Sequence, residues 1–144
     1  MYHAIRGRQL LVTLAPFIGT AGHRMLAQAQ HYGLSGDHDD FRANSRTVLL
    51  NPLFAALYWQ MNYHIEHHMF PMVPYHALPK LHALIKNDLP PPSPSIAAGY
   101  REMWPAVKRQ LRYEDYFLMR ELPPTAKPYK AELHDLEAAR IAAE

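Results

Sequence analysis

Two apolar runs dominate the first half of the chain, and each predicts a helix. Residues 10–34 are mostly apolar and are numerous enough to cross a bilayer as a helix. In lipid, such a helix is stable only if its polar side chains, among them His23 and Arg24, face protein or water. Residues 48–61 are too few to span a membrane, and their aromatic end is typical of a helix lying at the membrane interface. The pattern predicts one partial transmembrane helix followed by interfacial helices.

Helical spacing continues through the rest of the chain. Asn51 suits the N-cap of a helix beginning at Pro52, whereas Pro71 and Pro74 end a helix because proline has no amide hydrogen. No alternation of apolar and polar residues predicts a strand, so the expected fold class is all-α. Helices are expected at about residues 9–32, 52–68, 75–87, 97–112 and 130–142, with a polar loop over about 33–46.

The proline-rich residues 90–94 divide the chain into two parts, because such a run forms a stiff, extended linker. Residues 1–88 contain the long apolar runs and nearly all of the histidine. Residues 89–144 are polar and interrupted by proline. We therefore expect the boundary at 88/89, with a helical tail after it.

Composition narrows the possible chemistry. The 144 residues include no cysteine, which excludes a disulfide framework, a thiolate zinc site, an iron–sulfur cluster and a cysteine nucleophile. Basic and acidic residues nearly balance, and the resulting net charge of +2 is too small for binding to nucleic acid to be the main function. Histidine is abundant, with 10 residues, and metal sites without sulfur are built from imidazole and carboxylate groups.

The histidines concentrate in the segment 62–71. Because residues three and four apart share one face of a helix, His64, His67 and His68 project over an arc of roughly 100°. Three imidazoles at this spacing favour a site for iron, zinc, copper or nickel over a cluster of surface histidines. Glu66 points elsewhere on the same helix, and neither metalloprotease spacing nor Glu-x-x-His is present. His76 and His82 lie beyond the proline break and are expected to pack or face solvent.

The pattern His64-x-x-His67-His68, followed by Met-Phe-Pro, resembles the third histidine box of the membrane fatty acid desaturase and hydroxylase family. The longer string 62–79 resembles the bacterial branch described as fatty acid desaturases or hydrocarbon oxygenases. The resemblance also takes in residues 30–34, 44–47 and 51–52.

This resemblance implies a membrane enzyme with two Fe ions that activates O2 to desaturate or hydroxylate a fatty acyl or alkyl chain. By position, His64, His67 and His68 are implied to be iron ligands, and His31 is implied to be a further one. Electrons are implied to come from a ferredoxin, rubredoxin or cytochrome-type donor. The implied location is the bacterial inner membrane, with the tail after residue 88 in the cytoplasm.

The family supplies eight or nine histidines from three boxes, and the first two boxes are not found before residue 64. We therefore expect a C-terminal part of a desaturase-like protein, inactive by itself and completed by an N-terminal half. The alternative is a remnant without enzymatic activity that binds metal or a membrane surface.

Overall fold

The structure is a computed structural model, which describes residues 2–36 and 38–129. Within these residues the chain is helical and contains no strand, which confirms the all-α class. The helix predicted at 130–142 lies outside them. The elements are α1 (Tyr2–His31), α2 (Phe41–Asn44), α3 (Pro52–Leu57), α4 (His64–Met69), the 3-10 helix η1 (Tyr75–Ala77), α5 (Leu78–Ile85), the 3-10 helix η2 (Lys86–Asp88) and α6 (Ile96–Gln110).

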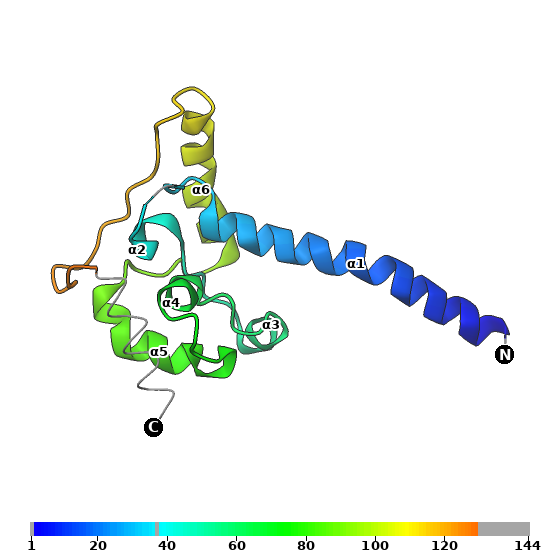
Figure 1. Cartoon of the computed structure of the whole chain (residues 1–144). Coiled ribbons are helices and arrows are strands. Elements are labelled where there is room, and N and C mark those ends of the chain that lie inside the picture. Colours follow the sequence, from blue (N-terminus) through cyan, green and yellow to red (C-terminus); the bar gives the residue numbers. More distant parts are fainter. Residues whose placement is uncertain (1, 37, 130–144) are drawn as a thin grey trace.

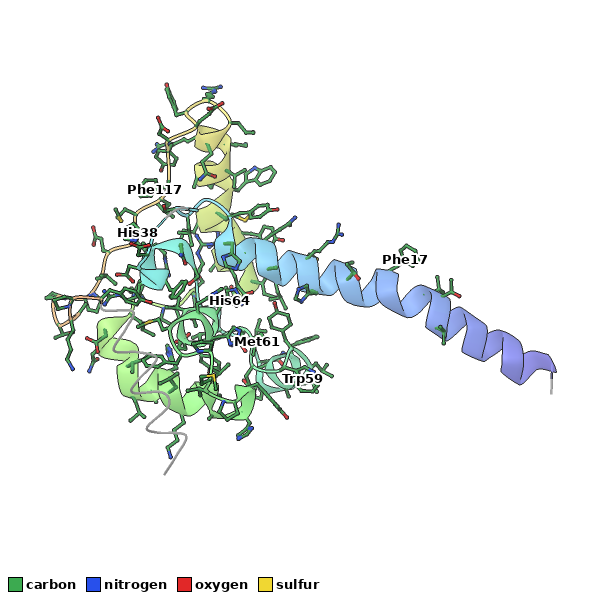
Figure 2. All side chains as sticks on the ribbon, in the orientation of Figure 1. Phe17, His38, Trp59, Met61, His64 and Phe117 are labelled. Carbon is green, nitrogen blue, oxygen red and sulfur yellow. The ribbon has the colours of Figure 1, made fainter. Side chains whose placement is uncertain are left out.

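Helix α1 projects away from the other helices, which gather around its C-terminal end (Figure 1). Its described side chains Val12, Leu14 and Phe17 are exposed, and Figure 2 shows Phe17 far from the compact part that contains His64. No helix in the described part of the chain combines the length and apolarity needed to cross a membrane. The predicted membrane-helical character is therefore not confirmed.

The single helix expected at 52–68 is two helices, with a turn over residues 58–63. Asn51 caps α3 as predicted, since its side chain accepts a hydrogen bond from the Phe54 amide at 2.9 Å. After α3 the backbone enters the left-handed region at Trp59 and Gln60, both with φ of 55°. Hydrogen bonds from distant segments replace the helical ones there: the Gln30 side chain donates to the Met61 carbonyl at 2.7 Å. Tertiary partners therefore interrupt a helix that local pattern favours.

The predicted polar loop over 33–46 contains the short helix α2. Asp40 caps it by accepting from the Arg42 amide at 2.9 Å. The Arg42 side chain is buried and forms an ion pair with the same carboxylate at 2.7 Å. Helix α2 lies against α4, so this loop forms one wall around the predicted histidine site.

The main apolar core lies between α4, α5 and the segments around them. It contains the buried side chains of Ile65, Met69, Phe70, Leu78, Leu81 and Leu89. Helix α4 contributes Ile65 and Met69, which follow its histidines by one residue each. One side of α4 is thus fixed in the core, while the side that carries His64 and His68 turns toward α1.

Helix α6 packs against the C-terminal part of α1. A Cβ atom on Gly99 would lie 3.6 Å from the Ala29 Cβ, and the Tyr100 hydroxyl donates to the Met25 carbonyl at 3.0 Å. The amide of Ser93 in the proline-rich segment also donates to the Thr47 carbonyl at 2.9 Å. Residues on both sides of the predicted boundary are therefore in contact; the boundary at 88/89 stays a prediction.

Replacing Gly33 by alanine is expected to lower the free energy of unfolding by about 1–3 kcal/mol. Gly33 has a φ of 81°, and an added Cβ would lie 2.9 Å from the Ala106 Cβ and 3.3 Å from the Met103 carbonyl oxygen. The turn that follows His31 would have to move away from α6. Urea denaturation followed by circular dichroism measures the loss.

The matched control is Gly22→Ala, because Gly22 lies within α1 and an added Cβ there meets nothing within 4 Å. Alanine favours the helix by about 0.5–1 kcal/mol over glycine, so this variant should be at least as stable as wild type. Equal destabilisation by both variants would contradict the role given to Gly33.

Candidate metal centre

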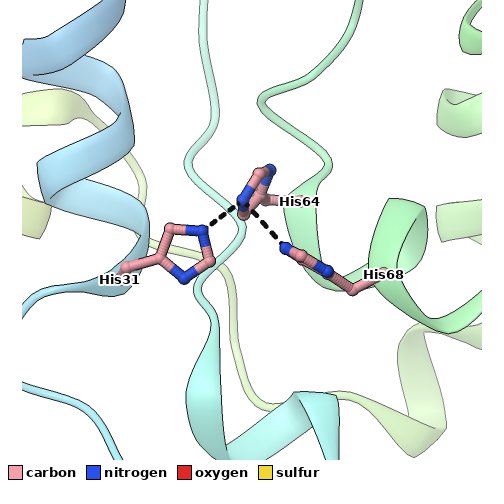
Figure 3. Close-up of side chains that lie close together, drawn as sticks. All are labelled: His31, His64 and His68. Atoms are coloured by element: carbon pink, nitrogen blue, oxygen red, sulfur yellow. Dashed lines mark hydrogen bonds between the residues drawn. The ribbon is translucent and has the colours of Figure 1, made fainter. Parts of the chain in front are cut away.

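Three imidazoles converge where the end of α1 meets the start of α4 (Figure 3). His31 is the last residue of α1, His64 is the first of α4, and His68 follows one turn later. The Nε2 atom of His64 lies 2.7 Å from Nε2 of His31 and 3.2 Å from Nε2 of His68. Three of the four sequence-predicted ligands are therefore brought together, and among the described residues they form the one group of three or more potential ligands with this convergence.

Contacts outside the cluster orient two of the rings. The Nδ1 atom of His31 lies 3.3 Å from the carbonyl oxygen of Asn44, at the end of α2. A carbonyl can only accept, so this contact places the His31 proton on Nδ1 and leaves Nε2 with a free lone pair. The Phe41 ring stacks on His68, with centroids 5.2 Å apart and planes 26° apart.

Hydrogen bonds among the three rings cannot give every Nε2 atom a partner. A neutral imidazole nitrogen is either a donor or an acceptor. His64 Nε2 therefore cannot donate a proton to His31 and also accept one from His68. Three Nε2 lone pairs directed at one cation would remove this conflict. Two imidazole nitrogens that bind zinc at about 2.0–2.1 Å lie roughly 3 Å apart, which is close to the separations seen here.

His67, the fourth predicted ligand, does not join the converging group. Its ring centroid lies 6.3 Å from that of His64 and 5.9 Å from that of His68. Its Nδ1 atom is buried and has no hydrogen-bond partner among the described residues. The Nδ1 atom of His64 is buried without a partner in the same way, and such an atom costs on the order of 1–3 kcal/mol.

Burial favours the uncharged form of two imidazoles of the cluster, His64 and His68. Loss of solvent, reinforced by the neighbouring imidazoles of His31, His68 and His67, lowers the pKa of His64 to about 3, although a hydrogen bond to the Met61 backbone acts in the opposite direction. Burial and the imidazoles of His31 and His67 also lower the pKa of His68. Neutral imidazole is the form that binds metal, so these two ligands are available at neutral pH.

The metal-free protein should lose stability as pH falls from about 6.5 toward 3. In the unfolded chain His64 takes up a proton near its ordinary pKa of 6.5, whereas in the folded chain it does so only near about 3. Between these values the unfolded state binds more protons, so acid lowers the free energy of unfolding, and the full contribution is present above pH 6.5. Urea denaturation in the presence of a chelator, repeated between about pH 6.5 and 3, measures this loss of free energy of unfolding. A His64→Gln variant should show a shallower pH dependence; an unchanged slope would contradict the assignment.

Two further residues, Glu66 and His82, form a polar contact beside the cluster. Glu66 is fully buried and pairs with His82 of α5. His82, which was expected to pack or face solvent, thus packs against a buried carboxylate of the site helix. Glu66 is not among the converging potential ligands. Its partner lies 16 residues away, and no local pattern joins the two.

An apolar groove of about 460 Å³ lies between α1 and α3. Its lining includes Leu26, Phe54, Tyr58 and Met61. Tyr58 also donates a hydrogen bond to the Gln30 side chain at 3.2 Å. Gln30 directly precedes His31 in the sequence.

A helical scaffold that brings three half-buried imidazoles together defines a candidate metal-binding protein of the all-α class. The sequence model of the family described as fatty acid desaturase matches residues 2–100. The chain belongs to the fatty acid desaturase family. Comparisons with curated proteins and with solved structures gave no match.

Proposed function

We propose that the chain carries part of the metal centre of an oxidoreductase that uses two iron ions to desaturate or hydroxylate a fatty acyl or alkyl chain. The observation that carries the proposal is the convergence of His31, His64 and His68 in a member of this family. Iron bound there would supply the activation of O2 needed to attack an unactivated C–H bond.

The residues present fit such a group. The three Nε2 atoms cannot all be satisfied by one another, and imidazole is a ligand that suits iron. The buried Nδ1 atom of His67, which has no partner among the described residues, would offer a fourth nitrogen for a separate ion. Together these atoms account for a first ion held by three imidazoles and for one ligand of a second.

The chain's own residues would shape the site around the ions. His31 is oriented by the Asn44 carbonyl, and Phe41 covers His68 and excludes water from that side. The apolar groove that includes Phe54 and Met61 suits a hydrocarbon chain, because apolar side chains line most of it.

Four imidazoles are too few for two iron ions that must be held on several helices. We therefore propose that a further segment, carrying the family's other histidines, packs against α1. The exposed apolar side chains of Val12, Leu14 and Phe17 support this, because they provide an unpaired surface on that helix. A ferredoxin, rubredoxin or cytochrome-type protein would supply the electrons.

The direct test of the metal centre is titration of the full 144-residue chain with Fe2+ under anaerobic conditions. About one tightly bound ion per chain is expected, with imidazole ligation visible by X-ray absorption spectroscopy. A chain that is folded by circular dichroism but binds no Fe2+ would overturn the proposal.

A second candidate function is that of a non-enzymatic module at a membrane surface. The exposed apolar face of α3 favours membrane contact whether the chain is part of an enzyme or such a module. Leu53, Phe54 and Leu57 are 67%, 59% and 68% exposed, and Trp59 beside them is 62% exposed. We propose that this face rests on the bilayer, as expected for the membrane location of the family.

Leu57→Glu should weaken binding to phospholipid vesicles by about tenfold or more, because burying one leucine side chain contributes about 1.5–3 kcal/mol. Vesicle flotation measures the bound fraction. The control is Leu111→Glu, at a leucine beyond the end of α6 that is 82% exposed, which should bind as wild type does. Equal loss in both variants would point to nonspecific adhesion.

A further inference from the structure

The carboxylate of Glu66 joins three segments of the chain behind the metal-binding side of α4. Its side chain is fully buried. One carboxylate oxygen accepts a hydrogen bond from the Thr47 hydroxyl at 2.5 Å, and the other contacts Nδ1 of His82. The Thr47 hydroxyl also accepts from the amide of Ile65 at 3.3 Å. The start of α4 is thus tied both to the 45–49 segment and to α5.

These contacts lie on the opposite side of α4 from the converging histidines. Successive residues of a helix are about 100° apart. Glu66 therefore lies roughly 200° around the helix from His64, while His68 lies only about 40° from it. A group that fixes Glu66 fixes the direction in which His64 and His68 point.

Helix α4 depends on such external contacts for its orientation. It has six residues, and the side chain of its N-cap residue, Tyr63, makes no capping hydrogen bond; helices this short are not stable alone. Its apolar anchors, Ile65 and Met69, pack in the core, but apolar contacts are not directional. The polar contacts of Glu66 supply the direction.

We infer that Glu66, held by His82 and Thr47, is a positioning residue that sets the rotation of α4 about its own axis and so brings His64 and His68 to His31. The inference rests on the proposed metal centre. A rotation of about 10° moves a group at the 5–6 Å outer radius of a helix by about 1 Å. Metal–ligand distances tolerate only about 0.2 Å, so loss of this hold should weaken metal binding.

The decisive variants are at His82, because it lies on another helix and is separate from the histidine cluster. His82→Leu removes the donor to Glu66, whereas His82→Asn retains an N–H near the position of Nδ1. In the full chain, His82→Leu should bind Co2+ about tenfold more weakly than wild type and should change the visible absorption of the bound ion. His82→Asn should restore both the affinity and the spectrum.

A second measurement needs no metal. The ring centroids of His31 and His64 are 4.6 Å apart, close enough for a nuclear Overhauser effect between the two rings in the apo-protein. We expect this signal in wild type and in His82→Asn, and we expect it to be lost in His82→Leu. Circular dichroism verifies that each variant is folded.

Glu102→Gln is the matched control for a general loss of stability. Glu102 is also a paired carboxylate, bound to Arg46 at 2.9 Å and Arg120 at 3.0 Å, but it lies on α6. It should lower stability without changing the Co2+ spectrum or the signal between the rings. Wild-type spectra and ring contacts in His82→Leu would overturn the positioning role alone. A wild-type chain that binds no Co2+ would instead overturn the proposed metal centre, and the ring contacts would still test the positioning role.

Discussion

His64→Ala should weaken the binding of Fe2+ or Co2+ to the full chain by roughly 100-fold or more, since loss of one ligand exceeds the 10–100-fold effect of losing an outer contact. His64 is the central residue of the cluster, because its Nε2 atom is the nearest neighbour of both His31 and His68. Without it, the two remaining imidazoles come from different helices and offer only two ligands. Isothermal titration calorimetry in the presence of a competing chelator measures the change.

The control is His76→Ala. His76 is exposed in η1 and makes no contact with the cluster, so this variant should bind metal as wild type does. Similar losses in the two variants would mean that metal binds to histidines generally and not to a defined centre.

Interactions between residues close in the sequence explain why much of the site could be predicted. Spacing alone places His64 and His68 on one face of a helix, and this is the arrangement observed. The N-cap at Asn51 also depends on neighbouring residues and occurs in the structure. The helix predicted over 75–87 occurs as α5, with the 3-10 helices η1 and η2 on either side. His31 entered the predicted set through family resemblance, and the structure places it against His64.

What could not be predicted depends on contacts between distant segments. The break between α3 and α4 is accompanied by hydrogen bonds from Gln30 and Val48, which lie outside the predicted helix. The pairing of Glu66 with His82 depends on how α5 folds back on α4. His67 shares the helical face expected of a ligand, yet the rotation of α4 turns it away from the point where the other three meet. The periodicity of the sequence does not indicate which distant segments will be in contact or how α4 is rotated about its axis.

The separate position of His67 leads to the last prediction, which concerns activity. The 144-residue chain by itself should not oxidise an acyl or alkyl substrate, because its described residues converge on one ion only. Joined to the segment of a family relative that carries the other histidines, and supplied with a reduced ferredoxin-type donor, it should convert a labelled fatty acyl substrate. Mass spectrometry of the product distinguishes desaturation from hydroxylation.

In that joined protein, His68→Ala and His67→Ala should each abolish conversion, and each should reduce bound iron from about two ions to about one, because oxygen activation requires both ions in place. The two variants should lose different ions: His68→Ala the ion near His31, and His67→Ala the other. An additional His31→Ala substitution should therefore lower the iron content of the His67→Ala protein further, but not that of the His68→Ala protein. Conversion by the bare chain would contradict the shared metal centre, and full activity of the His67→Ala protein would contradict the placement of a second ion at that residue.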